Sequence, residues 1–164
     1  QMRARQTAPA QGDEHVLMIS ASSSADRLVL DMLATAMEAC GRRVTVVGAE
    51  EDVRGAATLA MTLRPDLTCI VAISLTHGSE VRGYCRTLRS SIPGAKLLVL
   101  RPLTPAQNPE SAVTRLKEAG ADRVAVSIQQ ALQEADELLK ATGRDASTES
   151  RLEQPALSKR VSHA

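Results

Sequence analysis

One stretch, residues 67–89, constrains the fold of this chain more than any other. Residues 67–73 are almost all apolar and often β-branched, and no polar residues alternate with them. That pattern is typical of a central parallel strand covered on both faces. Apolar residues at helical spacing follow a short turn, namely Val81, Tyr84, Cys85, Leu88 and Ile92. The stretch therefore predicts a buried strand that leads into an amphipathic helix lying on the sheet.

The same strand and helix unit recurs along the chain. Strands are predicted at residues 15–20, 43–48, 67–73, 95–100 and 123–126, and a helix is predicted after each of them. Five alternating pairs require right-handed crossovers and a parallel sheet. The predicted fold class is α/β, a flavodoxin-like, three-layer, doubly wound sheet of five parallel strands in the order 2-1-3-4-5.

The first predicted helix begins at Ser23 or Ser24, with Asp26 near a capping-box position. Its buried side is predicted from helical spacing, as Val29, Met32, Leu33, Ala36, Met37 and Cys40. The last helix is expected to end near Gly143. Three regions follow from these elements: a flexible linker at 1–14, one domain at 15–142 and a disordered, polar tail at 143–164.

Composition argues against several classes of protein. Tyr84 is the only aromatic residue, and single-stranded nucleic acids and flat cofactors usually stack on aromatic side chains. The formal net charge of +1 provides no overall field that would attract polyanions. The three cysteines form no CxxC pair, so we predict buried thiols in a reducing compartment and no metal site. We expect neither a cofactor nor nucleic-acid binding.

Ligands of doubly wound sheets bind beyond the carboxyl ends of the strands, beside the switch between strands one and three. This rule places residues 20–24, 75–79 and 101–104 at the rim. The candidate ligand-binding residues there are Ser22, Ser23, Ser24, Thr76, His77 and Arg101. Hydroxyl groups at a helix N-terminus can hold a small anion, but plain helix capping explains the serines equally well. Both interpretations stay open.

Two functions that require specific residues are disfavoured. A phosphorelay receiver needs an acidic cluster after the first strand and an aspartate that ends the third, where this chain has serines at 20, 22–24 and 74. An enzyme could use His77 with Cys85, Glu80 or Ser79 as a nucleophile and base. However, Cys85 falls on the buried helix face, so we predict no catalytic residues and a non-enzymatic protein.

Three arginines, Arg82, Arg86 and Arg89, are spaced i, i+4 and i+7 along the third predicted helix. They form a basic stripe beside its apolar face. The stripe is either a solvated face or an interaction surface for an acidic partner or for phospholipid headgroups.

Several motifs resemble one known family. They are Ile73-Ser74, Arg82-Gly-Tyr-Cys-Arg-Thr-Leu-Arg89, Pro93, Leu97-Leu-Val-Leu100 and Ala119-Gly-Ala-Asp-Arg-Val-Ala-Val-Ser127. Residues 15–141 are thereby similar to the cytosolic C-terminal domain of permeases of the autoinducer-two exporter (PerM-like) family. The chain departs from that pattern at Ala72, where a cysteine is common, and at Thr76 and His77, where prolines are common. The family's domain has no catalytic residues to carry over.

A more distant resemblance is to cobalamin-binding domains, through Gly41, Val44, Gly48, Arg64-Pro-Asp66 and Gly120-Ala-Asp122. Their Asp-x-His-x-x-Gly motif falls on residues 24–29 of this chain. Asp26 stands where the cobalt-ligating His would be, and Val29 where the Gly would be. The resemblance therefore implies the fold of a cobalamin-binding domain without its usual ligand.

Together these features predict a non-enzymatic regulatory or interaction domain. The permease resemblance implies a soluble, transport-associated domain on the cytoplasmic side of the inner membrane, where it docks on the membrane-embedded part of the same permease or on a protein partner. The chain begins Gln1-Met2 and not with an initiator, so both a complete protein and a piece of a longer one stay open. The alternative is a domain that senses a small anion or an atypically bound cobalamin. A homo-oligomer is left open.

Overall fold

The computed structural model describes residues 13–21, 24–48, 50–73, 78–103 and 108–152, with side chains described as far as residue 141. The strands are β1 (His15–Ser20), β2 (Arg43–Val47), β3 (Leu67–Val71), β4 (Leu97–Leu100) and β5 (Arg123–Ala125). The helices are α1 (Ser24–Ala39), α2 (Val53–Leu63), α3 (Gly78–Ser91), α4 (Pro109–Glu118) and α5 (Ile128–Leu152).

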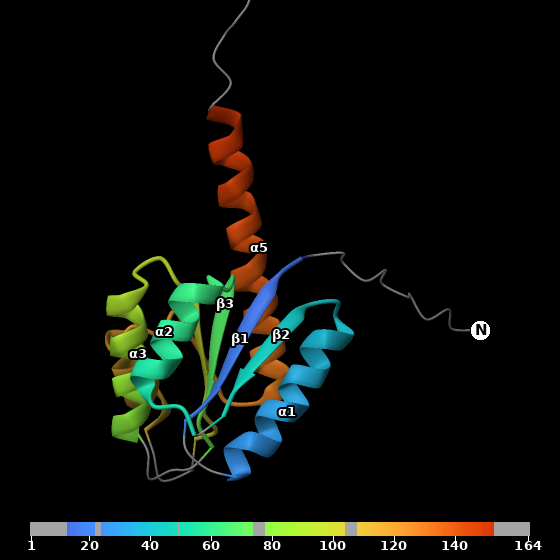
Figure 1. Ribbon diagram of the computed structural model, residues 1–164. Coiled ribbons are helices and arrows are strands. Elements are labelled where there is room, and N and C mark those ends of the chain that lie inside the picture. The colour runs from blue at the N-terminus through green and yellow to red at the C-terminus, as the bar shows by residue number, and fades with distance from the viewer. Residues whose placement is uncertain (1–12, 22–23, 49, 74–77, 104–107, 153–164) are drawn as a thin grey trace, which may run out of the picture.

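The described strands form one parallel sheet in the order β2-β1-β3-β4-β5 (Figure 1). This arrangement confirms the predicted flavodoxin-like fold. In the central strands β1 and β3 every residue is buried, as the continuous apolar runs in the sequence require.

Helices cover both faces of the sheet, and each face has its own apolar core. Side chains of a strand point alternately to the two faces. Leu17 and Ile19 of β1 accordingly pack with buried residues of α2, α3 and α4, whereas Val16 and Met18 pack with those of α1 and α5. Tyr84 belongs to the first core, where its hydroxyl donates a hydrogen bond to the Glu51 carbonyl at 3.4 Å.

Helix α1 buries a different side from the predicted one. Its buried residues are Asp26, Leu30, Leu33, Ala34 and Met37. The prediction was wrong for Met32, which is 53% exposed, and for Cys40, which was expected to be a buried thiol and is exposed. The reason is Asp26, which is fully buried and whose Oδ1 accepts a hydrogen bond from the Ile73 backbone N–H at 2.6 Å. This contact sets the rotation of the helix about its axis.

Helix α5 continues to Leu152, so the predicted end near Gly143 is wrong. Figure 1 shows its last turns extending beyond the end of the sheet. A single glycine inside a helix costs only about 1 kcal/mol relative to alanine, which is too little to end a helix by itself. Residues 143–152 of the predicted tail are therefore helical, and residues 153–164 lie outside the described part of the chain, as do residues 1–12 of the predicted linker.

Candidate functional site

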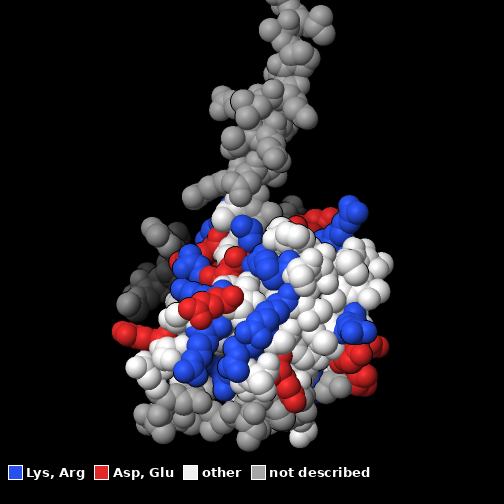
Figure 2. Space-filling model, turned by 90° about the vertical axis from the view of Figure 1, so that its left-hand side faces the viewer, with Lys and Arg blue, Asp and Glu red and all other residues white. Residues whose placement is uncertain are grey.

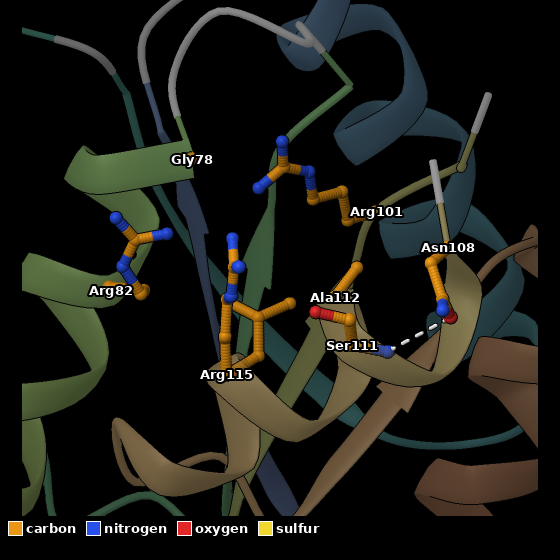
Figure 3. Close-up of a pocket in the computed structure, with 8 residues that line it drawn as sticks. Gly78, Arg82, Arg101, Asn108, Ser111, Ala112 and Arg115 are labelled. Carbon is orange, nitrogen blue, oxygen red and sulfur yellow. Dashed lines mark hydrogen bonds between the residues drawn. The ribbon is translucent and has the colours of Figure 1, made fainter. Parts of the chain in front are cut away.

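A cavity of about 340 Å³ opens between α3 and α4, beyond the carboxyl end of β4 (Figure 3). Its described lining consists of Gly78, Arg82, Arg101, Asn108, Ser111, Ala112, Arg115 and Leu116. We call it the arginine pocket, because three of its eight lining residues are arginines. It lies at the carboxyl edge of the sheet, where doubly wound folds bind ligands, but at β4 and not at the switch between β1 and β3.

Arg101 is fixed by the sheet. It directly follows β4, and its backbone N–H donates a hydrogen bond to the Ala125 carbonyl at 2.9 Å, which extends the pairing of β4 with β5. The residue is only 7% exposed. Its guanidinium lies against Gly78, where an added Cβ would come within 2.9 Å of one terminal nitrogen. Glycine at position 78 therefore leaves the space that the Arg101 side chain occupies.

Two helices supply the other arginines. Arg82 lies one turn after Gly78 on α3 and is half-buried, whereas Arg115 lies on α4 and is exposed. Figure 3 shows the guanidinium groups of Arg82, Arg101 and Arg115 directed toward a common space. Burial lowers the pKa of Arg101, and the nearby charge of Arg82 lowers it further.

The α4 wall also carries neutral polar groups. Asn108 caps this helix, because its Oδ1 accepts hydrogen bonds from the backbone N–H groups of Glu110 and Ser111. The cap leaves the Asn108 amide nitrogen and the Ser111 hydroxyl as donors on this wall. The pocket thus combines three cationic groups with neutral hydrogen-bond donors.

The described lining of the pocket is basic, whereas Glu80 and Glu110 lie close by in the first turns of α3 and α4. None of its described lining residues is acidic, and the neighbouring segments 74–77 and 104–107 contain no Asp or Glu in the sequence. Figure 2 shows the side of the molecule that carries α3, where Lys and Arg side chains gather with carboxylates beside them. An anion is therefore the class of ligand that this cavity suits best.

The predicted ligand-binding residues are only partly described. Arg101 lies in the arginine pocket, and Ser24 is an exposed residue at the start of α1, on the opposite face of the sheet. Ser22, Ser23, Thr76 and His77 lie outside the described residues. The structure thus brings Arg101 together with Arg82 and Arg115 and does not place Ser24 beside them.

The predicted arginine stripe is divided among three environments. Arg82 lines the arginine pocket, and Arg86 is exposed on the same helix. Arg89 makes contacts within the chain: its guanidinium donates hydrogen bonds to the carbonyls of Gly120, Pro93 and Ala95, and it forms an ion pair with Asp122 at 2.8 Å. Gly120, which has a φ of +120°, lies so close that an added Cβ would be 2.9 Å from the Arg89 Cβ.

The cysteines do not favour nucleophilic chemistry. Cys69 and Cys85 are fully buried, and burial raises the pKa of each thiol to about 12. Both thiols are therefore protonated at neutral pH, and the thiolate is the reactive form. Within the described ranges, no three His, Cys, Asp or Glu side chains gather in a way that could hold a metal ion.

Sequence reasoning did not identify Asn108, Ser111 or Arg115 as site residues. A signal was present, since Asn108, Ser111 and Arg115 are spaced i, i+3 and i+7 on a helix and so share one face. What the spacing could not reveal is that this face lies opposite Arg82.

None of the helices in the described part of the chain has both the length and the apolar character needed to cross a membrane.

Comparisons with known proteins identify the fold and no family. No family model matches the chain, and no curated protein matches it in sequence. Among solved structures, a cobalamin-binding protein from Desulfitobacterium hafniense DCB-2 matches with a TM-score of 0.63 at 12% identity, over 76% of this chain and 58% of that protein. This chain therefore spans little more than half the length of that neighbour.

Response-regulator structures match over nearly their full length. The chemotaxis response regulator CheY4 of Vibrio cholerae matches with a TM-score of 0.53 at 19% identity, over 77% of this chain and 99% of that one. A chain of the CheX-CheY-BeF3-Mg2+ complex from Borrelia burgdorferi matches with a TM-score of 0.54 at 15% identity, over 74% and 86%. At these identities the likeness shows that the chain shares the flavodoxin-like fold of cobalamin-binding and receiver domains.

Proposed function

We propose that this chain is a non-enzymatic regulatory domain that binds a small anionic ligand in the arginine pocket. One observation carries the proposal: guanidinium groups from three separate elements converge on one cavity, and one of them, on Arg101, is almost completely buried. Guanidinium groups form strong, often paired hydrogen bonds with phosphate and carboxylate groups, so an anion that enters this cavity can bind between Arg82 and Arg101.

The neighbouring folds agree with a binding role, although they do not determine it. One neighbour is described as a cobalamin-binding protein and another comes from a complex between two proteins. We propose that the bound anion alters how this domain docks on a protein partner. Cobalamin is disfavoured as the ligand, because Asp26 replaces the expected His and is fully buried against the Ile73 backbone.

Attachment to a membrane permease, and with it a place on the cytoplasmic side of the inner membrane, stays a prediction from the sequence resemblance. No comparison supports it, so transport is not part of this proposal. The basic stripe likewise stays a prediction as a docking surface. Of its three arginines, Arg82 lines the arginine pocket and Arg89 bonds groups of this chain. Arg86 is exposed and lies outside the pocket lining.

Calorimetry and thermal unfolding of the full 164-residue chain test the proposal, with inorganic phosphate and sulfate as probes. We expect saturable binding and a rise in Tm, since a ligand at 100 times its Kd stabilises the folded state by about 2.7 kcal/mol. Arg101→Gln should abolish the rise, and Gly78→Ala should weaken binding, because its new methyl group displaces the Arg101 guanidinium.

The matched control is Arg86→Gln. It removes the same charge from the neighbouring turn of α3, but Arg86 is exposed and does not line the pocket. We expect this variant to bind phosphate as the parent chain does. Equal losses of binding in Arg86→Gln and Arg101→Gln would indicate nonspecific attraction, and the absence of binding to the parent chain would refute the proposal.

A further inference from the structure

We propose that this chain associates with a second copy of itself through the outer side of α1, with the two α1 helices packed antiparallel. The inference goes beyond the proposed function and uses none of its residues, because α1 lies on the opposite face of the sheet from the arginine pocket. Three observations lead to it: an exposed apolar stripe on α1, the spacing of the residues in that stripe, and the charges beside it.

Helix α1 carries more apolar surface than its own core uses. The apolar residues that it buries are Leu30, Leu33, Ala34 and Met37. Its outward side is apolar as well, since Leu28 is 65% exposed and Met32 is 53% exposed. Figure 1 shows α1 at the periphery of the molecule, beside the edge strand β2. Large apolar side chains that lie together on the surface indicate an interaction site.

The exposed residues have the spacing of a coiled-coil seam. They are uncharged, mostly apolar, and follow one another at alternating intervals of three and four residues: Ala25, Leu28, Met32, Thr35 and Ala39. We call these five residues the α1 seam. A repeat that averages about 3.5 residues keeps one side of a helix turned toward a second helix along its whole length. The spacing therefore indicates that the seam is covered by another helix lying along α1.

The α1 seam matches itself when the second helix runs antiparallel. A two-fold axis through Met32 brings the two Met32 side chains together. Leu28 of one copy then lies level with Ala36 of the other, because each is four residues from Met32. Ala25 and Ala39, each seven residues from Met32, lie level in the same way. The large Leu28 side chain thus meets a small, half-buried residue, as interdigitated helix packing requires.

The charges beside the seam favour the same orientation. Arg27 and Glu38 are exposed and lie three helical turns apart, so they flank the seam on the same side. Arg27 is five residues before Met32 and Glu38 is six residues after it, so in the antiparallel pair their heights differ by about 1.5 Å. Each Arg27, which pairs with Asp31 of its own helix at 3.0 Å, would also face Glu38 of the other copy. The two Asp31 carboxylates approach each other near the axis, where both Arg27 side chains compensate their charge. In a parallel pair each of these residues would face its own copy, so charge complementarity selects the antiparallel dimer.

Sedimentation equilibrium of the full chain tests the proposal, under reducing conditions because Cys40 is exposed. One helix from each copy makes a small interface, so we expect a reversible dimer with a Kd of about 10–100 µM. Met32→Lys should keep the chain monomeric up to about 1 mM, because it brings two like charges together on the axis. Met61→Lys is the matched control. Met61 is 47% exposed on α2, on the other face of the sheet, and this variant should dimerise as the parent chain does.

Charge reversal tests the orientation of the two helices. Arg27→Glu should raise the Kd of the dimer at least about fivefold, because it places two carboxylates side by side at each end of the contact. Adding Glu38→Arg to the same chain exchanges the two charges and should restore the Kd to within about threefold of the parent value. Both residues are exposed, so the variants should keep the fold, as circular dichroism would verify.

Cross-linking measures the register independently. In a chain with Cys40→Ser, the remaining native cysteines, Cys69 and Cys85, are buried. Met32→Cys in this background should form a disulfide between the two copies on mild oxidation, because position 32 lies on the axis. Leu28→Cys should not, since the two copies of position 28 lie eight residues apart in height, about 12 Å.

A parent chain that remains monomeric at about 1 mM would overturn the proposal. If Met32→Lys then lowered the Tm of the monomer, the seam would be covered by a segment of the same chain instead. A dimer that persists in Met32→Lys would also overturn it, because the contact would then lie elsewhere on the molecule. Cross-linking of Leu28→Cys as efficient as that of Met32→Cys would refute the antiparallel arrangement.

Discussion

Replacing Arg89 tests whether this residue stabilises the fold or belongs to a docking surface. Its guanidinium joins the turn directly after α3 to a segment that is distant in the sequence. Nε and one terminal nitrogen donate to the Gly120 carbonyl, and the other terminal nitrogen donates to the carbonyls of Pro93 and Ala95. It also pairs with Asp122. An alanine at position 89 removes all of these contacts together.

The expected loss follows from the solvent access of each contact. A hydrogen bond to a charged group contributes about 1.5–3 kcal/mol when water is excluded, and an exposed ion pair contributes about 0.2–1 kcal/mol. The contacts with Gly120 and Ala95 are partly buried, whereas those with Pro93 and Asp122 are exposed. Allowing for partial solvation of the carbonyls after truncation, we expect Arg89→Ala to lower the free energy of unfolding by about 3 kcal/mol.

The assay is urea unfolding of the full chain followed by circular dichroism, and two further variants sharpen it. Arg86→Ala, an exposed residue on the same helix, should change the free energy of unfolding by less than about 0.5 kcal/mol. Arg89→Lys keeps the charge but lacks the planar fork, so it should recover less than half of the loss. A loss in Arg89→Ala no larger than that in Arg86→Ala would refute this reasoning and would make Arg89 available to the predicted docking surface.

Three further predictions concern Asp26 and the cysteines. Asp26→Ala should lower the free energy of unfolding in urea by about 2–3 kcal/mol, because it leaves the Ile73 N–H without this acceptor. Asp26→Asn keeps a carbonyl oxygen at that place and should lower it by about 1 kcal/mol or less. Equal losses in the two variants would contradict the importance of this contact. Ellman's reagent should modify Cys40 rapidly in the folded chain and spare Cys69 and Cys85. In the folded state Cys69 and Cys85 have a pKa of about 12, whereas in the unfolded chain cysteine loses its proton above about pH 8.5. The free energy of unfolding should therefore fall as the pH rises from about 9 to about 11. This loss should be smaller in a variant with alanine at both positions.

The sequence was sufficient to predict the sheet, because the information that specifies it is local. The apolar run Leu67–Val71 marks a strand covered on both faces, and Gly41 and Gly120, which follow α1 and α4, have the positive φ that glycine commonly adopts after a helix. Short alternating elements then leave few allowed topologies. The order of the strands follows from these rules and not from any one contact.

The rotation of α1 could not be predicted, because it depends on a contact between distant residues. Apolar spacing alone allows Met32 to face the core as well as Leu30 does. The structure resolves the choice through Asp26, whose carboxylate bonds the backbone at the end of β3. From the sequence alone, Asp26 cannot be distinguished from an ordinary acidic residue in the first turn of a helix, because its bond to a distant backbone N–H forms only in the folded chain.

The candidate site was predictable only in part for a similar reason. The position of Arg101 follows from the rule that ligands bind beyond the carboxyl ends of strands. Arg82 was found by its spacing but was assigned to a stripe with Arg89, because spacing along one helix does not show which neighbouring element each side chain meets. The sequence does not show that Arg115 lies in the same pocket as Arg82, because this depends on how α4 packs against α3 in the folded chain.

The two walls of the arginine pocket differ in how firmly they are held, and this difference bears on regulation. Helix α3 buries Val81, Tyr84, Cys85 and Leu88, whereas α4 buries only Leu116. Elements with few buried apolar contacts have the lowest local stability. An anion that joins Arg82 to Arg115 would therefore stabilise α4 far more than α3, since α3 is already fixed by its own core. Under the proposed function, α4 is the element whose order depends on the ligand, and its outer surface is where a partner could distinguish the bound domain from the free one.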